Sequence, residues 1–179
     1  MISIRQAESA SDCDHARRLI ASFITWLEEL YPDDPEGVDA YFASIQPVLA
    51  SLPGAYLLPA GRLLLAVCDG TVAGMVAMRD LSNGACEMKR MFVDSGFQGT
   101  GIGRAMAEAL ISEARDTGYV LMRLDTGHRQ VAAIGLYRSL GFKEIPPYYD
   151  ISEEQRADLI FMELPLTPLS ATGGTDSSA

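Results

Sequence analysis

The stretch that decides the fold is VDSGFQGTGIGRAMAEALISEAR, residues 93–115, in which a glycine-rich turn leads into a long amphipathic segment. Gly99, Gly101 and Gly103 stand close together, and glycine weakens a fold unless the backbone must bend sharply or approach another group. Apolar side chains at helical spacing follow: Ile102, Ala105, Met106, Ala109, Leu110 and Ala114. The stretch therefore predicts a strand ending at Val93, a turn, and a helix whose first N–H groups converge on one point.

The segments on both sides of this turn predict a single α/β domain with a mixed sheet. Before the turn we expect a strand at 2–7, helices at 10–30 and 36–51, a hairpin centred on Asp69-Gly70, and a strand at 85–93. After it we expect a strand at 119–126, a helix ending at Gly141, and two closing strands within FKEI and DLIFMEL.

Two further expectations concern the strand before the turn and the end of the chain. Alternation in ACEMKRMFV, residues 85–93, puts Glu87, Lys89, Met91 and Val93 on one face. The domain is predicted to span 1–164, and the Pro/Gly/Ser/Thr-rich residues 165–179 are expected to form a disordered tail.

Composition excludes several classes of function. A net charge of −10 argues against non-specific nucleic-acid binding, which depends on Lys and Arg neutralising phosphates. The apolar runs are too short to cross a bilayer and the N-terminus lacks a signal-peptide core, so we expect no membrane partner and a cytoplasmic location. Three cysteines without CxxC spacing and two histidines predict neither a disulfide framework nor a metal site.

Three kinds of phosphate-binding turn could explain the glycines. A P-loop requires Lys-Ser or Lys-Thr after the last glycine, and none is present. A dinucleotide fingerprint would fit Gly99 and Gly101, with Asp125 near the spacing of a ribose-binding acid, but its third glycine position holds Arg104. The third possibility is a general anion site: the positive end of a helix, open glycine backbone and the Arg104 cation would together hold a diphosphate.

QGTGIG, residues 98–103, resembles the (Arg/Gln)-x-x-Gly-x-(Gly/Ala) motif of the GNAT N-acetyltransferases, and LYRSLGF, 136–142, follows one strand and one helix later. The resemblance covers nearly the whole chain. It implies a mostly antiparallel, twisted sheet of six to seven strands flanked by about four helices. It also implies acetyl-CoA as co-substrate, whose pyrophosphate would contact Gln98, Gly99, Thr100, Gly101, Ile102, Gly103 and Arg104.

The same resemblance implies roles for residues outside the turn. Met91, Phe92 and Val93 would contact the pantetheine arm through their backbone, although ordinary strand packing would also explain them. Gln130 stands seven residues before Tyr137, where relatives often have an asparagine that contacts the cofactor. Tyr137 matches the tyrosine near the CoA sulfur, a possible general acid, and its place on an apolar helix stripe equally fits a core residue.

Glu87 is the candidate general base, acting directly or through water. An alkyl amine has a pKa of about 10.4 and is mostly protonated at neutral pH. A positioned base contributes a factor of about 10²–10⁴ in rate. Pairing with a lysine, or exposure to solvent, would explain this glutamate equally well.

The expected function is acetyl transfer from acetyl-CoA to an amine by direct attack in a ternary complex, in a monomer or homodimer. The alternative is a non-catalytic acyl-CoA sensor, and a dinucleotide-dependent reductase is a more distant one. By the same resemblance, EELYPDDPEGVD at 28–39 and PPYYD at 146–150 flank the acceptor site. Their carboxylates, including Asp33 and Asp34, and aromatic faces would suit a cationic amine, although an ordinary solvated loop explains them too.

Overall fold

The computed structural model describes residues 1–166, in which seven strands form one sheet of order β1-β2-β3-β4-β5-β7-β6. The strands are β1 (Ile2–Gln6), β2 (Arg62–Cys68), β3 (Thr71–Ser82), β4 (Ala85–Val93), β5 (Leu121–Gly127), β6 (Lys143–Ile145) and β7 (Leu159–Pro165). Only β4 and β5 pair in parallel among these strands, and the other neighbours are antiparallel. The predicted mixed, mostly antiparallel sheet is confirmed.

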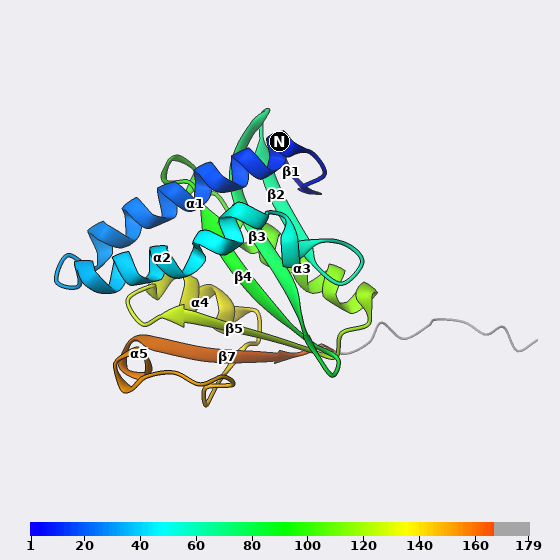
Figure 1. The fold of residues 1–179 in the computed structure, drawn as a ribbon. Helices are drawn as coiled ribbons and strands as arrows, with labels where there is room; N and C mark the ends of the chain where they lie inside the picture. Colours follow the sequence, from blue (N-terminus) through cyan, green and yellow to red (C-terminus); the bar gives the residue numbers. More distant parts are fainter. Residues whose placement is uncertain (167–179) are drawn as a thin grey trace, which may run out of the picture.

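Helices cover both faces of the sheet, with α1 and α2 together on one face and α3 and α4 on the other (Figure 1). The helices are α1 (Ala10–Leu30), α2 (Pro35–Ser51), α3 (Ile102–Thr117), α4 (Val131–Ser139) and α5 (Glu153–Asp158), and two short 3₁₀ segments are η1 (Gly54–Tyr56) and η2 (Ser95–Phe97). The short α5 was not expected because its residues form no apolar stripe. Its only signal is the capping box between Ser152 and Gln155.

Burial on both faces explains the continuous apolar run in β2. Leu63 and Leu65 pack under α1 and α2, whereas Leu64 and Ala66 pack under α3. Successive side chains of a strand point to opposite faces, so a sheet covered on both sides needs apolar residues at every position. The sheet therefore forms a central layer that separates the two helical layers.

A bulge in β4 overturns one expectation about that strand. Met75 pairs with Phe92 but Ala77 pairs with Lys89, so β4 holds one extra residue, and Arg90 in this stretch has a φ of 56°. Met91 and Val93 consequently pack on the α3 side with Met88, away from the face that carries Glu87 and Lys89. The prediction that all four alternating side chains share one face was wrong because a bulge reverses the alternation.

The folded chain extends beyond the predicted boundary at residue 164. Pro165 pairs with Leu121 at the end of β7, and Leu166 is buried and donates its N–H to the Val120 carbonyl oxygen at 2.8 Å. These two residues therefore belong to the sheet and its core, whereas the remainder of the expected tail, 167–179, lies outside the described residues. Within residues 1–166, none of the helices has the length and apolar character that a membrane crossing requires.

Candidate functional site

The sheet opens between β4 and β5. These two strands pair only where Ala85–Glu87 lie against Leu121–Arg123, and beyond that point they spread apart (Figure 1). The remaining residues of β4, 88–93, continue to pair with β3 on their other side. One edge of β4 is thus an internal strand edge, whose backbone N–H and C=O groups are available to an extended ligand.

A cavity of about 1060 Å³ lies over this opening. Its walls come from α1, α2, β4, β5, α4 and the segment that includes α5 and the start of β7. Its lining includes Tyr31, Tyr41, Met88, Lys89, Arg90, Met91, Phe92, Asp125, Thr126, Gly127, Gln130 and Tyr137. Four residues expected at the cofactor site, Met91, Phe92, Gln130 and Tyr137, are therefore brought together here.

The glycine turn directly follows β4 and forms the start of α3. Gly99 and Gly101 have φ angles of 75° and 87°, in the left-handed region that glycine adopts without strain. A Cβ atom at either position would meet no atom within 4 Å, so backbone conformation is the reason for both glycines. Gly103 differs: a Cβ there would make ordinary contacts with Leu136, Met91 and Val93, so the geometry of the turn accounts for two of the three glycines.

The N-terminus of α3 carries no side-chain cap. Gly101 is its N-cap residue, whereas side chains of Ser9, Asp34 and Ser152 cap α1, α2 and α5. The first N–H groups of a 16-residue helix are therefore left to bind an external acceptor, and the positive end of the helix dipole favours an anion. Arg104 adds a cation in the first turn, where it donates to Ser139 Oγ at 2.6 Å and lies 3.3 Å from Glu108.

The turn residues 98–104 are not among the residues that line the cavity. They adjoin it through Met91, which lines the cavity and which a side chain at Gly103 would contact. The expected phosphate site and the expected thiol end of the cofactor therefore occupy neighbouring regions along β4, joined by the end of that strand.

Tyr137 faces the cavity from the buried side of α4. Its ring packs against Phe142 with a centroid distance of 5.8 Å, and burial together with Asp125 raises its pKa above the ordinary value. The phenol therefore keeps its proton at neutral pH and is able to donate it. Gln130, at the N-cap position of α4, accepts a hydrogen bond from Thr126 Oγ1 at 3.0 Å, which fixes its amide at the mouth of the opening.

Glu87 is fully buried, and both oxygens of its carboxylate accept hydrogen bonds. Arg79 Nε donates to Oε2 at 2.5 Å, and Tyr148 donates its hydroxyl to Oε1 at 2.6 Å, with Lys89 Nζ 3.4 Å from the same oxygen. Burial alone raises the pKa of Glu87, but Lys89, Tyr148 and Arg79 outweigh burial, so that the pKa falls below its usual value. Glu87 is not among the cavity residues, and Lys89 connects it to Asp125, which is.

Two carboxylates of the acidic loop between α1 and α2 have structural roles that the sequence did not reveal. Asp33 forms a two-pronged ion pair with Arg129, at 2.5 and 2.7 Å, and Asp34 caps α2 by accepting from the Gly37 N–H. Tyr148 and Tyr149 pack against Phe161 instead of lining the cavity. A double substitution at Asp33 and Asp34 would therefore disturb the fold as well as any charge at the site.

Sequence reasoning missed Arg90 and the Lys89–Asp125 ion pair, both on the cavity wall. Adjacent lysine and arginine inside an otherwise apolar strand are a weak signal, and alternation would have pointed one of them away from the site. The bulge brings both into the cavity. Elsewhere, Cys86 is buried, which raises the pKa of its thiol to about 12. Among the side chains that the structure describes, no three or more His, Cys, Asp or Glu are grouped so that they could hold a metal ion.

Comparison with known proteins agrees with this geometry. Residues 17–142 match the family model described as "Acetyltransferase (GNAT) family". An uncharacterized N-acetyltransferase of Schizosaccharomyces pombe is 33% identical over 150 residues, which is 83% of this chain and 86% of that protein.

Two solved structures share the fold. A GNAT-family acetyltransferase from Staphylococcus aureus has a TM-score of 0.73 at 22% identity, covering 93% of this chain and 100% of that one. The PaiA N-acetyltransferase from Thermoplasma acidophilum, solved in complex with coenzyme A, has a TM-score of 0.70 at 16% identity, covering 92% and 99% of the two chains. At these identities the two structures establish the common fold.

Proposed function

Because the chain belongs to the GNAT acetyltransferase family, whose members are acyltransferases, we propose that it transfers the acetyl group of acetyl-CoA to an amine. The observation that carries this proposal is the opening between β4 and β5, at the point where β4 runs into the uncapped N-terminus of α3. It offers an internal strand edge beside an anion site, which matches the amide-rich arm and the pyrophosphate of acetyl-CoA.

The pyrophosphate would accept hydrogen bonds from the N–H groups at residues 99–104. The positive φ angles of Gly99 and Gly101 support this proposal, because they turn the backbone into the start of α3 without a side chain in the way. The pantetheine arm would pair with the free edge of β4 at Met91–Val93, and the Gln130 amide would contact the arm from the opposite wall.

In the chemical step, the neutral amine nitrogen attacks the thioester carbonyl carbon, the carbon–sulfur bond breaks, and coenzyme A leaves as a thiolate. The nitrogen loses its proton and the sulfur gains one. Tyr137 would supply the proton to the sulfur, because its raised pKa keeps the phenol protonated and its ring lines the cavity.

For Glu87 we propose a positioning role in place of the base role considered from sequence. A carboxylate with a lowered pKa is a weak base, and both oxygens of Glu87 already accept hydrogen bonds. Its contact with Lys89 would hold the lysine against Asp125 at the cavity wall. The acceptor amine would then lose its proton to water, so that the rate rises with pH toward the pKa of the amine.

The proposal is tested by calorimetric titration with acetyl-CoA and by release of free coenzyme A with a panel of amines. Saturable binding together with amine-dependent thiol release supports it. Tight binding without turnover of any amine would instead support a non-catalytic acyl-CoA sensor. Failure to bind acetyl-CoA would contradict the proposal that the opening between β4 and β5 is the acetyl-CoA site.

Tyr137→Phe is expected to lower kcat by up to about 10-fold while leaving the melting temperature and the affinity for acetyl-CoA unchanged. The substitution removes only a hydroxyl, and a thiol of pKa about 8.5 leaves readily even without an acid. Steady-state rates of coenzyme A release measure the effect. Tyr119→Phe, which removes a hydroxyl outside the cavity, is the matched control. An unchanged kcat in Tyr137→Phe would assign the residue to the core alone.

A further inference from the structure

Arg90 is a partly buried cation on the cavity wall, and no carboxylate of the described chain pairs with it. Its Nη1 donates to the Tyr41 hydroxyl at 2.7 Å, and its Nε is buried without a hydrogen-bond partner. Tyr56, whose side chain is also a phenol, is a further polar neighbour. Taking a guanidinium out of water is costly unless an anion compensates its charge. Arg90 has no such anionic partner in the described chain.

Three of the four carboxylates on the cavity wall, those of Asp34, Asp125 and Asp158, have other partners. Asp125 pairs with Lys89, Asp34 caps α2, and Asp158 lies 3.3 Å from the His128 ring. Glu36 also lines the cavity, in the exposed first turn of α2. None of them forms an ion pair with the guanidinium.

The backbone at Arg90 is also in a conformation that its residue type disfavours. Its φ of 56° lies in the left-handed region, which glycine would adopt without strain. The bulge that contains it inserts one residue into β4, and bulges of this kind re-aim side chains beside functional sites. An arginine at this position therefore points to a use for its side chain.

We propose that Arg90 binds a carboxylate of the acceptor, so that the preferred acceptors are amines that also carry a carboxylate, as amino acids do. The inference rests on the proposed acetyl transfer and names its substrate class. It differs from the sequence-based expectation of a cationic acceptor, because Arg90 is a cation on the cavity wall with which no described carboxylate forms an ion pair. A guanidinium is also the side chain best suited to a carboxylate.

A phosphate of acetyl-CoA is the other anion that could reach the cavity. Arg90 contacts Tyr41 of α2, on the face of the sheet covered by α1 and α2, whereas the glycine turn leads into α3 on the opposite face. The location therefore favours the acceptor, and the experiment separates the two sources through the affinity for acetyl-CoA.

The test compares each of several amino acids with its amide, using coenzyme A release by the full chain at saturating acetyl-CoA. Amidation also changes the pKa of the amine. The quantity to compare between proteins is therefore a ratio: the kcat/KM of the amino acid divided by the kcat/KM of its amide. Arg90→Gln is expected to lower that ratio about 10- to 100-fold, the usual loss of a charge-assisted hydrogen bond, without changing the KM for acetyl-CoA. Arg138→Gln, which neutralises an exposed arginine outside the cavity, should leave both quantities unchanged.

A ratio that is equal in wild type and Arg90→Gln would overturn the inference while leaving acetyl transfer intact. A raised KM for acetyl-CoA with an unchanged ratio would assign Arg90 to the phosphates instead. If Arg90→Gln does not fold, Arg90→Gly removes the same charge and relieves the backbone strain, so it serves as the second variant.

Binding of the reaction product gives a readout that does not depend on turnover. In calorimetry, the wild type should bind the N-acetyl amino acid at least about 10-fold more tightly than it binds the corresponding amide. Arg90→Gln should bind the two compounds with equal affinity. Equal affinities for the two compounds in the wild type would contradict the inference, whether or not any amine is acetylated. Absence of acetylation with every amine would instead count against the proposed function.

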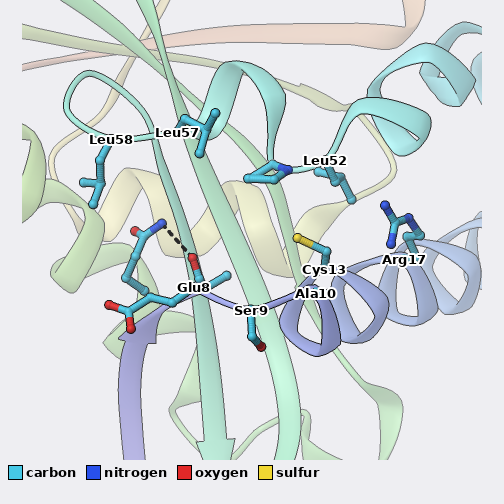
Figure 2. A pocket seen from close by; sticks show the side chains of 11 residues that line it. Glu8, Ser9, Ala10, Cys13, Arg17, Leu52, Leu57 and Leu58 are labelled. Atoms are coloured by element: carbon cyan, nitrogen blue, oxygen red, sulfur yellow. Dashed lines mark hydrogen bonds between the residues drawn. The ribbon is translucent and has the colours of Figure 1, made fainter.

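A second cavity lies apart from the one beside β4 and shares no lining residue with it. It has a volume of about 430 Å³ and lies where the end of β1 meets α1 and the segment around η1 (Figure 2). Cys13 and Leu52 are among the residues that line it.

Discussion

Glu87→Gln is expected to lower the free energy of unfolding by about 3 kcal/mol, because it removes one partner from a buried ionic cluster. The amide would place a donor against Arg79 Nε or lose the acceptor for Tyr148, and it would cancel the charge that faces Lys89. Urea denaturation followed by circular dichroism measures the loss. The free energy difference is large enough to shift the midpoint of the transition clearly.

The pH dependence of this difference has a definite sign. Burial by itself raises the pKa of Glu87, yet Lys89, Tyr148 and Arg79 together lower it, so the folded-state pKa lies below the unfolded-state value of about 4.3. The stabilisation is therefore complete above about pH 4.3 and is lost as the pH falls through the folded-state pKa. Wild type and Glu87→Gln should differ most near neutral pH and converge in acid.

Glu163→Gln is the matched control for this prediction. Glu163 also lies on a strand and pairs with an arginine, Arg123 Nε at 2.8 Å, but it is partly exposed and belongs to a single pair. Exposed pairs contribute about 0–1 kcal/mol, so this variant should remain near wild-type stability. Wild-type stability in Glu87→Gln, together with a rate reduced by 10²-fold or more, would return Glu87 to the role of general base.

Gly101→Ala is expected to raise the Kd for acetyl-CoA by about 10- to 100-fold and to lower the free energy of unfolding by roughly 1–2 kcal/mol. Gly101 has a φ of 87°, so a Cβ atom strains the turn and shifts the first N–H groups of α3 away from the proposed pyrophosphate site. Isothermal titration calorimetry and thermal unfolding of the same preparation give the two quantities.

Gly118→Ala separates backbone strain from ligand binding. Gly118 ends the same helix with a φ of 94°, and a Cβ atom there would also meet no atom within 4 Å. The two substitutions should therefore cost similar stability, while Gly118→Ala keeps the wild-type affinity for acetyl-CoA. If both variants bind acetyl-CoA as the wild type does, the phosphate site lies elsewhere.

Much of the fold could be predicted because the information is local. The apolar stripe from Ile102 to Ala114, the Asp69-Gly70 hairpin and the run LLLAV each specify one element through spacing and turn chemistry. The structure has the corresponding helix, hairpin and buried strand. The positive φ angles of Gly99 and Gly101 follow from the same kind of local signal.

The features that could not be predicted depend on contacts between distant segments. No local pattern announces the extra residue at Arg90, because a bulge forms only when β4 is matched against β3. Arg129 and Asp33 are 96 positions apart, so their ion pair could not be read from the acidic loop. Glu87 resembled an available base for the same reason: Arg79 and Tyr148 reach it from other parts of the chain.

The divergence of β4 from β5 also bears on aggregation. A strand edge with unpaired backbone groups normally invites pairing with a strand of another molecule, and proteins protect such edges by charge, bulges or cover. Here the edge lies inside the sheet, with α1 and α2 over one face, α3 and α4 over the other, and a bulge within the strand itself. The chain can therefore offer strand-like hydrogen bonding to a slender ligand and deny it to a second polypeptide, which needs the width of a full strand with its side chains.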